Sequence, residues 1–86
     1  MACYQIDWRS SARRELRDLP PRVIARIVDV VAGLRDDPRP TGCRKLRGSE
    51  RTFRIRIGQY RVVYEVQDDR LIVLIIRVRH RRDVYR

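Results

Sequence analysis

The segment Thr52–Val66 carries the most regular pattern in the chain, with apolar and charged residues alternating on both sides of Gly58 and Gln59. Such alternation is typical of strands that have one buried face. Glycine in the first position of a two-residue loop is typical of a type II′ turn. The segment therefore predicts an antiparallel β-hairpin, which the rest of the chain must cover on its apolar side.

The register of this hairpin brings arginines together on its other side. A two-residue turn at Gly58-Gln59 places Arg56 opposite Arg61, and Arg54 on the same face. Like charges directly opposite each other destabilise a strand pair by as much as ~1 kcal/mol. A chain that tolerates this arrangement is expected to bind an anion there.

Composition supports a basic protein with a single domain, residues 1–86. Hydrophobic residues make up 43% of the chain, which is enough for a core, and 21 Lys+Arg against 11 Asp+Glu give a net charge of +10. Such an excess of positive charge favours polyanionic partners. Lys45 is the only lysine, so nearly all of the positive charge is carried by arginine. The planar guanidinium group of arginine favours partners that it can bind through two hydrogen bonds, such as phosphate.

Several classes of protein are not indicated. The sequence has no apolar run of the ~18 residues that a membrane span needs, and no signal-peptide pattern, so we expect a cytoplasmic protein without membrane contact. Cys3 and Cys43 lack CxxC partners and His80 is the only histidine, so the spacing typical of zinc sites is absent. We expect neither a metal nor a cofactor.

The remaining segments predict two helices and further strands. The expected elements are a strand at Cys3–Trp8, a helix capped by Ser10 or Ser11 and ended by Pro20, a helix from Pro21 to Leu34, a basic connector at Thr41–Arg51, and a central strand at Leu71–Val78 with Ile76 in the core. The predicted fold class is α+β: an N-terminal strand and a helical hairpin packed on one face of an antiparallel sheet of about four strands.

The C-terminal segment Arg79–Arg86 brings more positive charge to the same face, and the register leaves two alternatives open. A two-residue loop at Asp68-Asp69 places His80 on the face of Arg61. An odd-length loop or a bulge places Arg79 and Arg81 there instead.

Three segments together resemble the RelE/ParE family of toxins: KLRG at 45–48, RIRIGQYRVVYEV at 54–66 and VLIIRVRHRRDVYR at 73–86. The resemblance covers essentially the whole chain, including SARREL and LP in the helical hairpin. It implies a type II toxin–antitoxin pair, in which an acidic, partly disordered antitoxin wraps a small basic toxin. RelE-like members cleave mRNA on the ribosome, whereas ParE-like members inhibit DNA gyrase without being nucleases.

The RelE-like catalytic pattern has two basic residues before the hairpin turn, an arginine after it, and an arginine and a tyrosine in the tail. Arg54 and Arg56, Arg61, Arg81 and Tyr85 occupy these places. RelE-like enzymes usually have lysine before the turn, and arginine is no general base because it stays protonated. The resemblance therefore implies that Arg54 and Arg56, together with Lys45 and Arg79, bind phosphate. It implies that Arg61 and Arg81 stabilise the reacting groups, and that Tyr85 or His80 is the base or a stacking platform.

The resemblance thus implies a ribosome-dependent mRNA endoribonuclease that needs no metal and leaves a 2′,3′-cyclic phosphate. Its expected partners are an acidic antitoxin, with a heterotetramer as one possible complex, and mRNA in the ribosomal A site. The alternatives are a ParE-like gyrase inhibitor and a cationic RNA-binding module without activity.

Overall fold

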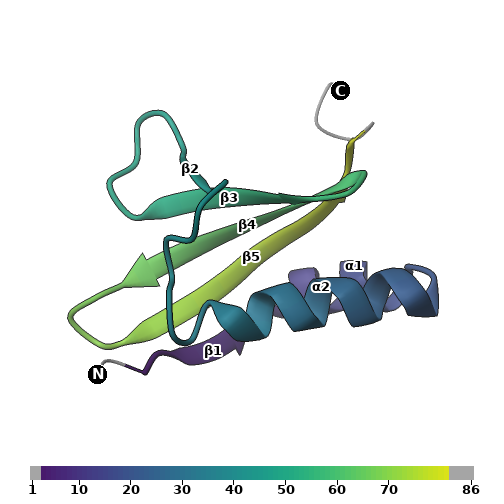
Figure 1. The fold of residues 1–86 in the computed structure, drawn as a ribbon, viewed down its shortest axis with the longest axis horizontal. Coiled ribbons are helices and arrows are strands. Elements are labelled where there is room, and N and C mark those ends of the chain that lie inside the picture. The colour runs from purple at the N-terminus through teal and green to yellow at the C-terminus, as the bar shows by residue number, and fades with distance from the viewer. Residues whose placement is uncertain (1–2, 82–86) are drawn as a thin grey trace.

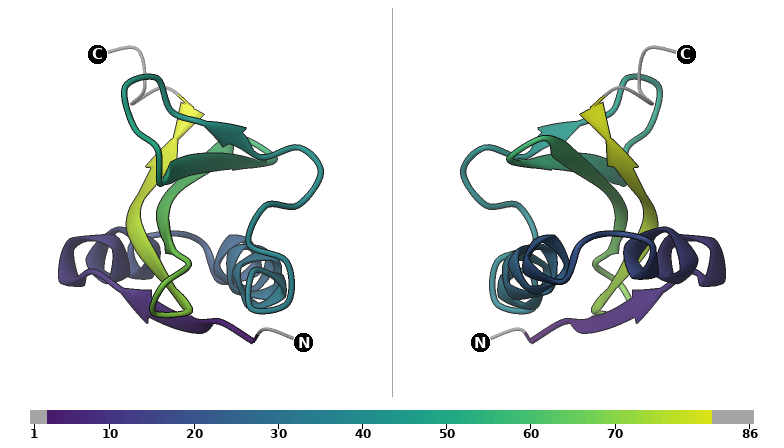
Figure 2. Two further views of the ribbon diagram at one scale, coloured as in Figure 1. Left: turned by 90° about the vertical axis from the view of Figure 1, so that its left-hand side faces the viewer. Right: turned by 90° about the vertical axis from the view of Figure 1, so that its right-hand side faces the viewer.

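A mixed sheet of five strands forms the framework of the protein, with two helices packed against it (Figure 1). The computed structural model describes residues 3–81. Its elements are β1 (Gln5–Trp8), α1 (Ser10–Arg17), α2 (Pro21–Gly33), β2 (Arg44–Lys45), β3 (Thr52–Ile57), β4 (Tyr60–Gln67) and β5 (Ile72–His80). The strands lie in the order β1-β5-β4-β3-β2. Figures 1 and 2 show β1 on the side of the molecule where the helices lie, and β2 and β3 on the other side.

The predicted α+β class is confirmed, but the sheet is larger than the four antiparallel strands that the sequence predicts. β1 pairs in parallel with β5, from Gln5 opposite Ile72 to Trp8 opposite Ile75. The chain passes from β1 into a helix rather than a hairpin, so no turn residues in the sequence mark this pairing. The second addition is β2, whose two residues pair antiparallel with β3.

Both predicted helices are present. α2 begins at Pro21, as predicted, where the missing N–H is not needed for the helical ladder. The expected serine cap of α1 is wrong: Arg9 occupies the N-cap position, and no side chain caps the helix. The reason lies in the sheet, since the Arg9 N–H donates to the Ile75 carbonyl at 2.9 Å and the chain enters the helix directly afterwards.

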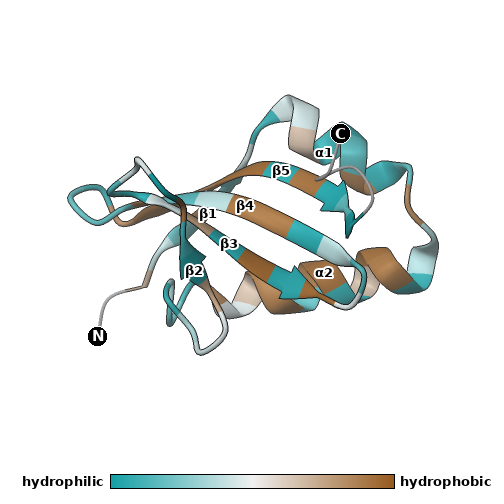
Figure 3. Cartoon of the chain, turned by 90° about the horizontal axis from the view of Figure 1, so that it is seen from above, coloured by the Kyte–Doolittle hydropathy of each residue, from teal (hydrophilic) through white to brown (hydrophobic). Residues whose placement is uncertain are grey.

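A single apolar core lies between the helices and the sheet. Hydropathy alternates along β3 and β4 (Figure 3), and the residues buried there are Phe53, Ile55 and Ile57 of β3 and Val62, Tyr64 and Val66 of β4. α1 contributes Ala12 and Leu16, and α2 contributes Ile27 and Val31. The most deeply buried large side chains are those of Tyr64, Ile27, Leu34, Ile75, Val62, Val66 and Val73. The opposite face of β3 and β4 carries Arg54, Arg56 and Arg61.

β5 contains an irregularity that changes the predicted core. Val63 pairs with Arg77 but Tyr64 pairs with Ile75, so Ile76 is an extra residue in a β-bulge. Ile75 is fully buried, whereas Ile76 is only half-buried. The prediction that placed Ile76 in the core is therefore wrong by one position.

Candidate functional site

The β3–β4 hairpin has the predicted geometry. Gly58 has a φ of +61°, a backbone conformation that glycine adopts readily, and the turn leaves Ile57 opposite Tyr60. Arg56 lies directly opposite Arg61, as predicted. The Arg56 Nε donates to the Gly58 carbonyl at 3.1 Å, which orients this side chain at the turn.

The bulge in β5 decides which residue of the C-terminal segment joins Arg61. The β4–β5 loop spans Asp68–Leu71 and is longer than two residues; beyond the bulge, Arg79 lies directly opposite Arg61. His80 instead pairs with Tyr60, and the two rings meet edge to face with their centroids 5.0 Å apart. Of the two open alternatives, the bulge is the one that occurs. Arg56, Arg61 and Arg79 consequently form one row across three strands.

An open hollow of about 360 Å³ lies on this face. Its size falls within the range of small-molecule sites. The lining residues are Gly42, Arg44, Arg54, Arg56 and Arg61, so arginine accounts for every side chain at its wall. Each guanidinium group offers a planar set of N–H donors that matches the oxygens of phosphate. The hollow is therefore suited to a phosphodiester or a similar anion.

Sequence reasoning missed Arg44 and chose its neighbour Lys45. In the structure Arg44 pairs with Arg54, and strand alternation keeps both on the arginine face. Lys45 pairs with Phe53, lies outside the hollow and forms an ion pair with Glu50 at 3.4 Å. Strand alternation is the signal that could have pointed to Arg44. Neighbouring residues of an extended segment point to opposite faces, so only one of Arg44 and Lys45 can lie on the arginine face.

The tail residues are only partly described. The Arg81 N–H donates to the Gln59 carbonyl at 2.6 Å, so the Arg81 backbone lies beside the β3–β4 turn, and its side chain is exposed. The expectation for Tyr85 lies outside the described residues. Within residues 3–81 no three His, Cys, Asp or Glu side chains gather where they could hold a metal ion.

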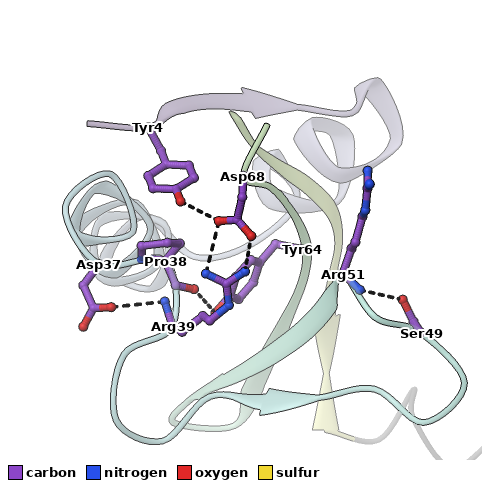
Figure 4. A network of polar contacts seen from close by, with 8 residues as sticks. All are labelled: Tyr4, Asp37, Pro38, Arg39, Ser49, Arg51, Tyr64 and Asp68. Carbon is purple, nitrogen blue, oxygen red and sulfur yellow. Dashed lines mark hydrogen bonds and ion pairs between the residues drawn. The ribbon is translucent and has the colours of Figure 1, made fainter. Parts of the chain in front are cut away.

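A polar network ties the connector between α2 and β2, which carries Gly42 and leads to Arg44, to the rest of the fold (Figure 4). The Arg39 Nη2 lies 2.6 Å from Asp68 Oδ2, and the Tyr4 hydroxyl donates to Asp68 Oδ1 at 2.5 Å. Hydrogen bonds from Arg39 and then from Tyr4 lower the pKa of Asp68. The buried Tyr64 hydroxyl donates to the Pro38 carbonyl at 2.9 Å, and burial raises the pKa of Tyr64. These contacts fix the connector against the sheet.

Taken together, fold and site define a small basic α+β protein whose sheet presents a group of arginines on one face. The family model described as the ParE toxin of the type II toxin-antitoxin system parDE matches residues 6–85. The protein belongs to this family, and with its RelE-like relatives to the RelE/ParE superfamily of toxins.

Two relatives in sequence extend over nearly the whole chain. Toxin RelG of Mycobacterium tuberculosis is 39% identical over 84 residues, which cover 96% of this chain and 97% of RelG. The putative toxin RelE1 of Methanocaldococcus jannaschii is 28% identical and covers 96% of each chain.

Solved structures show the same fold. The toxin–antitoxin complex RelBE2 of M. tuberculosis has a TM-score of 0.79 at 36% identity, covering 92% of this chain and 99% of the other. The isolated E. coli toxin RelE has a TM-score of 0.80 at 29% identity, covering 90% and 83%. The archaeal RelE–RelB complex of Pyrococcus horikoshii OT3 has a TM-score of 0.83 at 26% identity, covering 94% and 97%. In the described part of this chain, no helix is long and apolar enough to cross a membrane.

Proposed function

We propose that this toxin is a ribosome-dependent endoribonuclease that cleaves mRNA. The observation that carries the proposal is the row formed by Arg56, Arg61 and Arg79 beside the arginine-lined hollow. Relatives named RelE and RelG support the same branch of the family. Cleavage of a phosphodiester places additional negative charge on the phosphate oxygens in the transition state, and a group of arginines fixed on one sheet face is suited to stabilise that charge.

The reaction is an internal transesterification. The 2′-hydroxyl of one nucleotide attacks the adjacent phosphorus, the bond from phosphorus to the 5′-oxygen breaks, and a 2′,3′-cyclic phosphate and a 5′-hydroxyl result. Arg61 and Arg79 stabilise the charge on the phosphate oxygens, while Arg54, Arg56 and Arg44 hold the RNA backbone. Arg81, beside the turn, stabilises the negative charge on the leaving 5′-oxygen, which takes up a proton from water to give the 5′-hydroxyl.

The proton of the 2′-hydroxyl must pass to a base, and arginine does not serve as one. His80 packs edge to face against Tyr60 in register, away from the row of arginines, so this histidine is the weaker candidate. Tyr85, the other candidate that the resemblance gives, is therefore the proposed base. With so little acid–base chemistry of its own, the enzyme depends on the ribosome to hold the mRNA in a reactive geometry.

The proposed protein partner is an acidic antitoxin. Similar structures are described as RelB–RelE antitoxin–toxin complexes. The net charge of +10 on this chain favours an acidic partner, which would also neutralise the arginine face.

A second function, inhibition of DNA gyrase without catalysis, is favoured by the family model, which is named after ParE. Induced expression in bacteria separates the two functions. mRNA 5′ ends are mapped within minutes of induction, and DNA breaks are measured in the same cultures. New 5′ ends within translated codons support the nuclease; intact mRNA with DNA breaks and filamentation supports the gyrase inhibitor and overturns the proposal.

A further inference from the structure

Glu15 forms an ion pair with Arg79 of the arginine row, and it lies on α1 rather than on the sheet. It is the only acidic residue of α1, whose sequence is SSARRELR. A helical glutamate usually pairs with a cation three or four positions away in the same helix. Those positions hold Ser11, Ala12, Asp18 and Leu19. The carboxylate is therefore not used to neutralise its own helix.

Glu15 instead contacts β5 where the parallel ladder with β1 has ended. The last contact of that ladder is the hydrogen bond from the Arg9 N–H to the Ile75 carbonyl. Farther along β5, the Val78 N–H points to the same edge and donates to Glu15 Oε1 at 2.9 Å. One carboxylate oxygen thus replaces the carbonyl acceptor that a neighbouring strand would offer to the Val78 N–H. Such an acceptor is needed because a buried N–H without a partner is costly.

The second carboxylate oxygen contacts the arginines on either side of Val78. Glu15 Oε2 lies 3.3 Å from Arg79 Nε and 3.9 Å from Arg77 Nη1. The Glu15 side chain is 24% exposed, against 39% for Arg79 and 51% for Arg77, so the shorter contact is also the less exposed one. Partial burial and the hydrogen bond to Val78 hold this carboxylate in place, unlike an ordinary surface ion pair.

The atom that Glu15 contacts determines what Arg79 can do. An ion pair at Nε lies on the inner side of the guanidinium group and leaves the two terminal nitrogens for a second, bidentate partner. Arg79 lies directly opposite Arg61, where repulsion between like charges would otherwise turn the side chain away. The negative charge of Glu15, 3.3 Å from Arg79 Nε, offsets that repulsion.

We infer that Glu15 is a positioning residue that acts through Arg79, holding its guanidinium group so that the terminal nitrogens face the anion bound beside Arg61. This inference rests on the proposed function and deepens it, since it adds a residue outside the sheet to the phosphate site. Glu15 itself does not touch the RNA.

The test compares Glu15→Gln with wild type in single-turnover cleavage of mRNA on programmed ribosomes. The amide oxygen of Gln still accepts the Val78 N–H, whereas the charge attraction to Arg79 is lost. We expect the maximal rate to fall about tenfold, the low end of what losing an orienting partner costs at metal sites, with little change in the half-saturating ribosome concentration. Asp18→Asn, an exposed change at the C-cap of the same helix, is the matched control and leaves the rate unchanged.

A double-mutant cycle shows whether the effect passes through Arg79. In an Arg79→Ala background, Glu15→Gln is expected to slow cleavage no further. Two results overturn the inference: a Glu15→Gln rate within twofold of wild type, or an effect of Glu15→Gln that is equally large without the Arg79 side chain.

A measurement without RNA separates this inference from the proposed function. In ¹⁵N NMR spectra of the wild-type toxin, the Arg79 Nε–Hε proton is expected to exchange with water more slowly than that of Arg44, and Glu15→Gln removes the difference. Equal exchange at Arg79 and Arg44 in wild type overturns the positioning role even if the toxin cleaves mRNA. A toxin that cleaves no mRNA but shows the slow proton overturns only the proposed function.

Discussion

Asp68 shows how a single side chain can hold together segments that are far apart in the sequence. It accepts hydrogen bonds from Tyr4 before β1 and from Arg39 in the connector, while Asp68 itself lies in the β4–β5 loop. Arg39 in turn lies over the Phe53 ring, 5.2 Å from its centroid. The connector that leads to Arg44 therefore depends on this carboxylate.

The lowered pKa of Asp68 predicts a stability that depends on pH. A carboxyl group whose folded pKa is depressed stabilises the fold above its unfolded pKa of about 3.9, and this contribution is lost as the pH falls through the lower folded value. Asp68→Asn is therefore expected to lower the free energy of unfolding at pH 7, and this deficit is expected to be smaller at pH 2, because the contribution of the charge is lost as the pH falls. Urea denaturation at both pH values measures this, with the exposed neighbour Asp69→Asn as control. A deficit of the same size at both pH values would show that the carboxylate charge is not responsible.

At this scale the sequence predicts the residues whose positions follow from local rules. Arg54, Arg56 and Arg61 could be placed because a two-residue turn fixes alternation and register together. Arg44 and Lys45 could not be told apart, because a two-residue strand has no pattern of its own and its register comes only from pairing with β3. Glu15 gave no sequence signal, because its partners lie more than 60 residues away.

At the scale of an element, β5 is the strand that sequence patterns describe least well. Its apolar run predicts a central strand, and the structure confirms that β5 lies between β1 and β4. A run that is apolar at every position carries no alternation, however, so it cannot reveal a bulge. The bulge at Ile76 reverses the alternation within β5 and thereby decides whether Arg79 or His80 faces Arg61.

Two substitutions at neighbouring positions test this bulge. Ile75→Asp places a carboxylate in the fully buried core, and we expect a loss of several kcal/mol, which is a large part of the stability of a small domain. Ile76→Asp is expected to lower the stability much less, because the Ile76 side chain in the bulge is only half-buried. Thermal melts followed by circular dichroism measure both. Greater damage from Ile76→Asp would mean that the register of β5 is shifted by one residue.

At the scale of the whole molecule, the sheet joins the two ends of the chain. The pairing of β1 with β5 is parallel, and no turn sequence marks it. This is why the sequence predicts a sheet with too few strands. The layering of helices on one apolar face followed from hydrophobic periodicity alone and is confirmed. What remains on the other face is positive charge, and its consequences extend beyond the site.

The net charge of +10 predicts that binding to an acidic antitoxin weakens as salt is added. At 1 M salt the Debye length falls to about 3 Å, so the attraction between exposed charges that are farther apart than this is largely screened. Isothermal titration with the antitoxin at low and high salt measures the effect, and association rates should fall with the affinity. An affinity that hardly changes with salt would show that an apolar groove dominates the interface.

The account depends most directly on Arg61, which lies between Arg56 and Arg79 in the row of arginines. Single-turnover cleavage of mRNA on programmed ribosomes compares wild type with Arg61→Ala, using Arg70→Ala in the exposed β4–β5 loop as a control and thermal melts and antitoxin binding as checks on folding. We predict that Arg61→Ala folds normally and loses ~2.7 to 4 kcal/mol of transition-state stabilisation, so that cleavage slows about 10²- to 10³-fold. A well-folded Arg61→Ala toxin that cleaves within about threefold of wild type, a difference under ~1 kcal/mol, would contradict the account and favour gyrase inhibition.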